Sequence, residues 1–213
     1  MTADLFTLQG FEAAANALEN DLLAPGGPRI STMRNHNFAI LLYPPREEYR
    51  LRSRVRQLAN RLETAEGWAV LSLALHELVF ERAVAEKGPD WLKGLAERER
   101  RIFVRSPERA LNTIQSELGE FIDGPNGLAK DVADRIAAFR AQHPQAEDRT
   151  LVLLGRAGAL YPFFRSSALL KHLGDRTLNT PVVLLYPGER RDGGLSFMQQ
   201  LEPDRDYRPR IYA

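Results

Sequence analysis

The chain has 213 residues, of which 44% are hydrophobic and 27% charged, so it is long enough to bury a core without disulfides or metal ions. Its 29 Lys and Arg nearly balance its 28 Asp and Glu, so no global field attracts nucleic acid or anionic lipid, and such binding would require a local patch. The absence of cysteine excludes disulfides, thiolate nucleophiles and cysteine-based metal centres. We expect one domain over residues 1–213, in a reducing cytoplasm.

Hydrophobic periodicity predicts alternating helices and strands. In the first half of the chain, the pattern predicts a helix over residues 4–23, a strand over 38–42, a helix over 47–65 closed by Gly67, a strand over 68–73 and a helix over 76–86. A helical middle over 88–144 follows. The last part is predicted to contain a strand over 150–154, a loop over 155–158, a helix over 162–173 with Gly174 as a left-handed C-cap, and a strand over 181–185. There is no basic and apolar leader near Met1 and no run of about 18 apolar residues, so we expect neither export nor a membrane span.

The strands are apolar throughout and are separated by helices, which is typical of a parallel sheet covered on both faces. We therefore predict an α/β fold, with an open, mostly parallel sheet and helices on both sides. Residues 88–144 contain no strand pattern and read as a helical insertion within it. Inside this insertion, Ser106 as N-cap and Pro107 at the first helical position predict the start of a helix.

Three Tyr-Pro pairs follow predicted strands, at Tyr43-Pro44, Tyr161-Pro162 and Tyr186-Pro187. The carboxyl ends of parallel strands share one edge, where ligands bind in doubly wound folds. The structural interpretation, which we favour, is that proline stops each strand while tyrosine covers the sheet edge; the alternative is a functional edge. The candidate interaction or ligand edge comprises Tyr43, Pro44, Gly155, Arg156, Gly158, Tyr161, Pro162, Arg165, Ser166, Tyr186, Pro187, Gly188, Glu189 and Asp192.

Common catalytic signatures are absent from the sequence. There is no P-loop and no GxSxG nucleophile elbow, and the four histidines, at 36, 76, 143 and 172, lack metal-ligand spacing. We therefore predict no catalytic residues, no metal and no cofactor. Arg156 and Arg165 can recognise a phosphate or carboxylate, although a salt bridge is the favoured role. For Glu189 and Asp192 we expect an ordered turn held by ion pairs with Arg190 and Arg191.

The most basic segment is the predicted helix over residues 47–65. Arg50, Arg54 and Arg61 share one helical stripe, which predicts a possible basic patch. A solvated helix face is the common outcome for such a stripe. If the stripe is a binding surface, it suits a DNA backbone and an acidic protein equally well.

The segment from Leu154 to Ser166, LGRAGALYPFFRS, resembles the glycine-rich, Tyr-Pro-Phe and Arg-Ser signature of the BrxB family of BREX phage-exclusion systems. A second segment, PVVLLYPGE from Pro181 to Glu189, resembles the family's next signature, and Tyr207-Arg208 resembles its closing segment. Arg190-Arg191 and Pro209 depart from the family pattern, so detailed contacts in that loop do not carry over.

The resemblance implies a subunit of a bacterial phage-defence system. Its expected partners are a PglZ-type alkaline-phosphatase-like protein above all, an AAA+ ATPase and a DNA methyltransferase. No catalytic residues are established for the family. The sequence thus predicts a non-catalytic assembly or adaptor subunit, with two alternatives: a nucleotide- or anion-binding enzyme or sensor at residues 155–166, or DNA-backbone binding through the arginine-rich helix 46–61.

Overall fold

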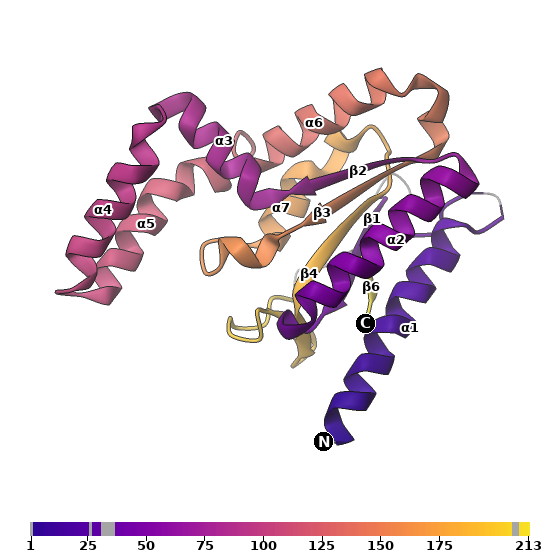
Figure 1. The fold of residues 1–213 in the computed structure, drawn as a ribbon, viewed down its shortest axis with the longest axis horizontal. Helices are drawn as coiled ribbons and strands as arrows, with labels where there is room; N and C mark the ends of the chain where they lie inside the picture. The colour runs from indigo at the N-terminus through magenta and orange to yellow at the C-terminus, as the bar shows by residue number, and fades with distance from the viewer. Residues whose placement is uncertain (1, 26, 31–36, 206–208) are drawn as a thin grey trace.

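A computed structural model describes residues 2–25, 27–30, 37–205 and 209–213. Its centre is an open sheet of five parallel strands in the order β2-β3-β4-β1-β6, and a sixth strand, β5, pairs antiparallel with the end of β4. The strands are β1 (Phe38–Tyr43), β2 (Ala69–Ala74), β3 (Thr150–Gly155), β4 (Val182–Arg191), β5 (Gly194–Phe197) and β6 (Arg210–Tyr212). Figure 1 shows the sheet between helices, which confirms the predicted α/β class.

Helices cover both faces of the sheet because successive strand residues point to opposite sides. On one face, Ala39, Leu41 and Tyr43 of β1 pack with apolar residues of α1 (Thr2–Leu22) and α2 (Glu48–Glu66). On the other face, Ile40 and Leu42 pack in a larger cluster with residues from α3 to α7. These helices are α3 (Leu75–Lys87), α4 (Asp90–Phe103), α5 (Pro107–Ile122), α6 (Leu128–Gln142) and α7 (Ser166–Leu173).

Helix starts and stops follow the expected local chemistry. Gly67 caps α2 in the left-handed conformation, at φ 68°, which glycine adopts without a Cβ penalty. Ser106 caps α5 by accepting a hydrogen bond from the Arg109 backbone N–H at 3.4 Å, and Pro107 is the first helical residue. The segment between β2 and β3 is helical, as predicted.

The helices α4 and α5 form an antiparallel hairpin that extends away from the sheet in Figure 1. The hairpin joins the core at its base, through Leu95, Leu118, Phe121 and Ile122. The Trp91 and Phe121 rings meet edge to face there, with centroids 5.6 Å apart.

The last helix ends at Leu173, as predicted, but it differs in its first residue and in the conformation of its cap. It begins at Ser166 rather than 162, because the backbone N–H groups of Phe163 and Phe164 both donate to the Leu160 carbonyl and prolong a tight turn. At its end, Gly174 has φ 13° and ψ −109°, so the predicted left-handed C-cap is wrong.

The fourth strand was expected to stop near residue 185, but β4 continues to Arg191. Pro187 lies opposite Tyr43, the last residue of β1, so its missing N–H falls where the parallel ladder ends. Beyond it, β4 pairs with β5 across the turn residues Asp192 and Gly193, at φ 49° and 78°, which is typical of a tight hairpin.

The predicted ion-paired turn at this place is therefore wrong. No ion pair within the described ranges joins Glu189 or Asp192 to Arg190 or Arg191. Instead Glu189 accepts a hydrogen bond from Gln199 at 3.4 Å. Hairpin strand β5 and the short edge strand β6 were missed.

Candidate functional site

The carboxyl ends of β1, β3 and β4 meet where the chain leaves the sheet in opposite directions. After β1, the short 3-10 turn η1 (Pro45–Glu47) leads into α2 on one face. After β3, the turn η3 (Ala157–Leu160) leads toward α7 on the other face. Such a divergence opens a crevice outside the strand ends, which is where ligands bind in open α/β sheets.

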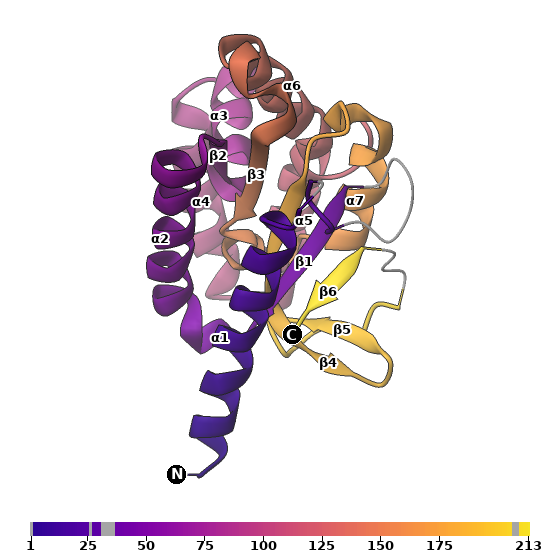
Figure 2. The ribbon, with the colours of Figure 1, turned by 90° about the vertical axis from the view of Figure 1, so that its right-hand side faces the viewer.

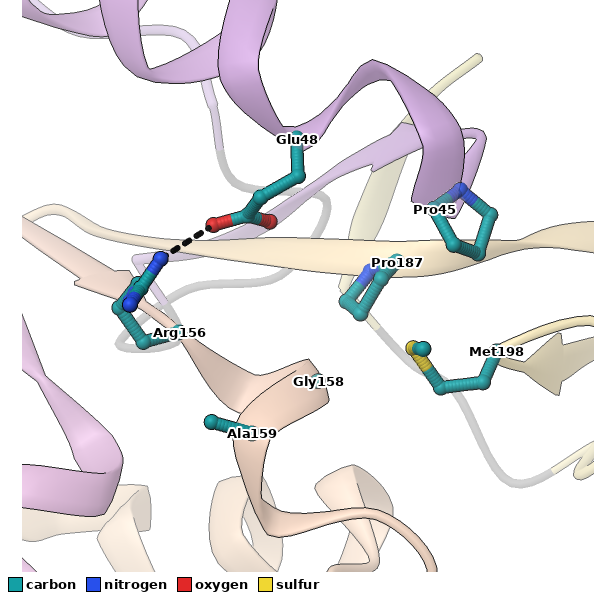
Figure 3. A pocket seen from close by; sticks show the side chains of 7 residues that line it. All are labelled: Pro45, Glu48, Arg156, Gly158, Ala159, Pro187 and Met198. Atoms are coloured by element: carbon teal, nitrogen blue, oxygen red, sulfur yellow. Dashed lines mark hydrogen bonds and ion pairs between the residues drawn. The ribbon is translucent and has the colours of Figure 1, made fainter.

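The smaller of two hollows at this edge has a volume of about 180 Å³. It is lined by Pro45, Glu48, Arg156, Gly158, Ala159, Pro187 and Met198. Figure 3 shows Glu48 and Arg156 facing each other, with Pro187 and Met198 nearby. A Cβ on Gly158 would lie 3.0 Å from Met198 Sδ and 3.3 Å from Pro187 Cγ. Gly158 therefore allows the β3 connection to approach the β4–β5 hairpin closely.

The second hollow, of about 340 Å³, lies beside the first and shares Glu48 and Arg156 with it. Its apolar lining comes from α2 and from the ends of three strands: Leu51, Val55, Leu73, Ala74, Leu153 and Leu185. Its charged lining has three guanidinium groups, from Arg52, Arg56 and Arg156, and one carboxylate, from Glu48. We call the two hollows together the edge cleft.

Glu48 lies at the centre of the edge cleft. Its carboxylate accepts a hydrogen bond from the Tyr43 hydroxyl and lies 3.5 Å from Arg156 Nη1 and 3.9 Å from Arg52 Nε. Its place in the first turn of α2 also favours a negative charge. Burial, and then the hydrogen bond to Glu48, raise the pKa of Tyr43 above its ordinary range, so the phenol is a protonated donor rather than a base.

Arg156 has an unusual backbone conformation for this position. Its φ of 61° and ψ of 25° lie in the left-handed region, which costs a non-glycine residue about 1 kcal/mol or more. Residues held in this way concentrate at functional sites. Its side chain, 39% exposed, reaches Glu48 across the cleft.

The structure brings only part of the predicted edge together. Gly155, Arg156, Gly158 and Pro187 line the edge cleft. Tyr43 and Tyr186 lie on neighbouring strands but belong to opposite faces of the sheet. The Tyr186 hydroxyl donates to the Leu195 carbonyl at 3.2 Å, inside the hairpin.

Other predicted residues lie away from the cleft. The Tyr161 ring, 37% exposed, lies 6.5 Å from the Phe197 ring, and Pro162 follows it in the same turn. Arg165 is exposed at the start of α7, and Ser166 beside it is buried. Pro44 precedes η1, while Gly188 and Glu189 lie in the hairpin and Asp192 at its turn.

The predicted arginine stripe on α2 is paired with carboxylates. Arg54 and Arg61 each lie 2.7 Å from the buried Glu19 of α1, and Arg50 Nη1 lies 3.5 Å from Glu47. The contacts with Glu19 join α2 to α1, and with Arg50 also paired the stripe carries less free charge than its sequence indicates. DNA binding through this stripe stays a prediction.

Sequence reasoning missed Glu48, Arg52 and Arg56 as site residues. Their signal is the four-residue spacing, which places them on one side of α2. Met198 gave no signal, because it reaches the cleft only through the unpredicted β5.

Comparison with known families fits this architecture. The model of the family described as BREX protein BrxB matches residues 71–211. The chain belongs to the BrxB family. The BrxB match begins inside β2 and extends into β6, so it includes Arg156, Gly158 and Met198 but not Glu48. Membership makes the chain a component of a BREX antiviral-defence system.

No curated protein and no solved structure matches this BrxB-family chain. Within the described ranges, no helix has the length and apolar character needed to cross a membrane. The same residues contain no group of three or more His, Cys, Asp or Glu side chains arranged to hold a metal ion. The predicted closing signature, Tyr207-Arg208, and His36 lie outside the described residues.

Proposed function

We propose that the chain is a non-catalytic assembly subunit of its BREX system, which docks other components at the edge cleft. The observation that carries this proposal is the composition of the cleft. An apolar floor bordered by arginines is typical of the centre and rim of a protein interface. Candidate partners, from the family resemblance, are a PglZ-type protein first, then an AAA+ ATPase and a DNA methyltransferase.

The charged groups of the cleft support recognition over chemistry. The Glu48 carboxylate already contacts a hydroxyl and two guanidinium groups, and Tyr43 stays protonated. A general base or nucleophile needs a reactive group near its task pKa. The cleft instead offers an ion pair that a partner's polar groups can join.

The test measures binding of the purified chain to each BREX component by calorimetry. Arg56→Glu should weaken binding about tenfold or more, because it reverses an exposed charge at the cleft rim. Lys171→Glu is the matched control, since this exposed lysine lies in α7 on the opposite face. Failure of the wild-type chain to bind any component would reject the proposal. Equal affinities of the Arg56→Glu and Lys171→Glu variants would show that the edge cleft is not the docking surface.

A second candidate function is anion or nucleotide binding in the larger hollow. The three converging arginines favour it, because guanidinium groups recognise phosphate and carboxylate. Arg156 is one of these three arginines, whereas Arg165 does not line the hollow, so this candidate rests on the first residues of the segment 155–166.

Calorimetry with ATP, and separately with inorganic phosphate, tests this candidate. Arg156→Ala should reduce affinity about tenfold, while Arg165→Ala should leave it unchanged. Absence of heat with both probes, or an Arg156→Ala variant that binds normally, would reject it.

A further inference from the structure

The outer end of the α4–α5 hairpin exposes apolar side chains that nothing in the described structure covers. We call residues 99–113 the hairpin tip. Of the seven large hydrophobic side chains exposed in the described ranges, three belong to it: Phe103 at 53%, Val104 at 86% and Leu111 at 45%. Only Ala110 is buried within the tip. Figure 1 shows this end of the hairpin far from the sheet.

Arginines surround these apolar groups. The tip contains four arginines, Arg100, Arg101, Arg105 and Arg109, and two glutamates, Glu99 and Glu108. All four arginines are exposed, and no ion pair involves their side chains within the described ranges. At the boundary of the tip, by contrast, Arg98 pairs with Glu117 at 2.9 Å.

The tip contributes little to the fold that would explain these residues. The outer ends of α4 and α5 project beyond the core, which the hairpin joins through its base. Exposed apolar groups that are surrounded by polar residues mark interaction sites. Aromatic and arginine side chains are also those that contribute most to protein interfaces.

We propose that the hairpin tip inserts into an acidic, apolar-lined recess on a protein partner within the defence assembly. Phe103 and Val104 supply the buried contact, and the unpaired arginines supply complementary charge and orientation. This inference rests on the proposed function and adds a second docking surface with a stated partner chemistry.

Two other classes of partner fit the tip less well. A phosphate backbone offers no apolar surface, so it would leave the side chains of Phe103 and Val104 exposed. A helix that lies on a membrane presents a continuous apolar face along its length. Here the exposed apolar groups cluster near the turn, because the apolar sides of the helices at the base pack into the core.

The test uses the full chain with each purified BREX component. Arg101→Glu with Arg105→Glu should weaken binding at least tenfold and reduce its salt dependence. Phe103→Ser with Val104→Ser should also weaken it at least tenfold, without the change in salt dependence. The control pair is Lys93→Glu with Lys171→Glu, which makes the same charge change at exposed lysines outside the tip.

A benzophenone-bearing residue in place of Val104 should crosslink to an acidic segment of the partner, whereas one in place of Lys93 should not. If the wild-type chain binds no component, both the proposed function and this inference fail. If it binds and the tip variants bind equally well, the inference alone fails. It also fails if these variants lose binding to duplex DNA or anionic vesicles while protein binding is unchanged.

Discussion

The Tyr43 side chain joins the core to the edge cleft, because its ring is buried and its hydroxyl donates to Glu48. Tyr43→Phe keeps the ring and removes the donor. We expect the free energy of unfolding to fall by about 1.5–3 kcal/mol, the usual size for a hydrogen bond to a charged group. Urea unfolding monitored by circular dichroism measures the change.

Tyr49→Phe provides the matched control, since Tyr49 is 76% exposed and its ring contact with Arg52 survives the change. We expect it to alter the unfolding free energy by less than about 0.5 kcal/mol. Equal effects of the two substitutions would contradict the structural role of the Tyr43 hydroxyl.

Alkaline pH should destabilise the fold through two buried phenols. Burial raises the pKa of Tyr43 and of Tyr212, and hydrogen bonds to Glu48 and to Asp21 raise them further. In the unfolded chain both phenols lose their protons near pH 10. Their stabilisation is therefore complete below about pH 10 and is lost above it, because the unfolded state releases protons that the folded state keeps.

Each phenol should lower the unfolding free energy by up to about 1.4 kcal/mol per pH unit above pH 10. Urea titrations between pH 9 and 11 measure the slope. Tyr43→Phe and Tyr212→Phe should each make this slope shallower. Identical slopes in the wild-type chain and the two variants would show that neither buried phenol titrates as argued.

Among the elements, the β4–β5 hairpin has little tolerance for added volume. A Cβ on Gly188 would lie 2.3 Å from the Ser196 carbonyl oxygen and 2.6 Å from Tyr186 Cε1. Gly188→Ala should therefore destabilise the chain by about 2–4 kcal/mol, because backbone and a buried ring must both shift. Urea unfolding gives the value.

The same change from glycine to alanine should have the opposite effect on the unfolding free energy when it is made inside a helix. Gly94 lies within α4, and a Cβ there meets nothing within 4 Å. Gly94→Ala should stabilise the chain by about 0.5–1 kcal/mol, since glycine weakens helix interiors. A neutral Gly188→Ala variant would mean that the hairpin is not packed as described.

The sequence predicted elements well where burial is uniform. The central strands β1, β3 and β4 are apolar throughout their predicted cores, because neighbours cover both faces. The edge strand β6 has only three residues, with one buried, so no apolar run marks it. The extension of β4 past Pro187 depends on where β1 ends, which no local pattern encodes.

The candidate site was predictable only in part for a related reason. The glycine-rich segment after β3 gave Arg156 and Gly158 locally. Glu48 joins them only because β1 lies two places from β3 in the sheet, with β4 between. Strand order is a property of the whole fold, so residue spacing in the sequence could not show that Glu48 forms an ion pair with Arg156.

Across the whole molecule, the two faces of the sheet have different partners. Helices α1 and α2 cover one face and are joined by Glu19, which contacts Arg54 and Arg61. Figure 2 shows these two helices next to each other, with α1 beside β1. The core on the other face holds the base of the α4–α5 hairpin. The edge cleft and the hairpin tip are therefore both supported by the same sheet.

This division predicts that the hairpin tip can be removed without loss of the fold. Replacing residues 99–113 by a short Gly-Ser linker keeps Trp91, Leu95, Leu118 and Phe121 at the base and removes one buried residue, Ala110. We expect the unfolding free energy to change by less than about 2 kcal/mol, because little apolar area leaves the core.

Leu95→Ala, which keeps the tip, should lower the unfolding free energy by about 2–5 kcal/mol through the cavity it creates. Urea unfolding compares the two variants. A shortened chain that unfolds without cooperativity would show instead that the projecting turns are part of the core.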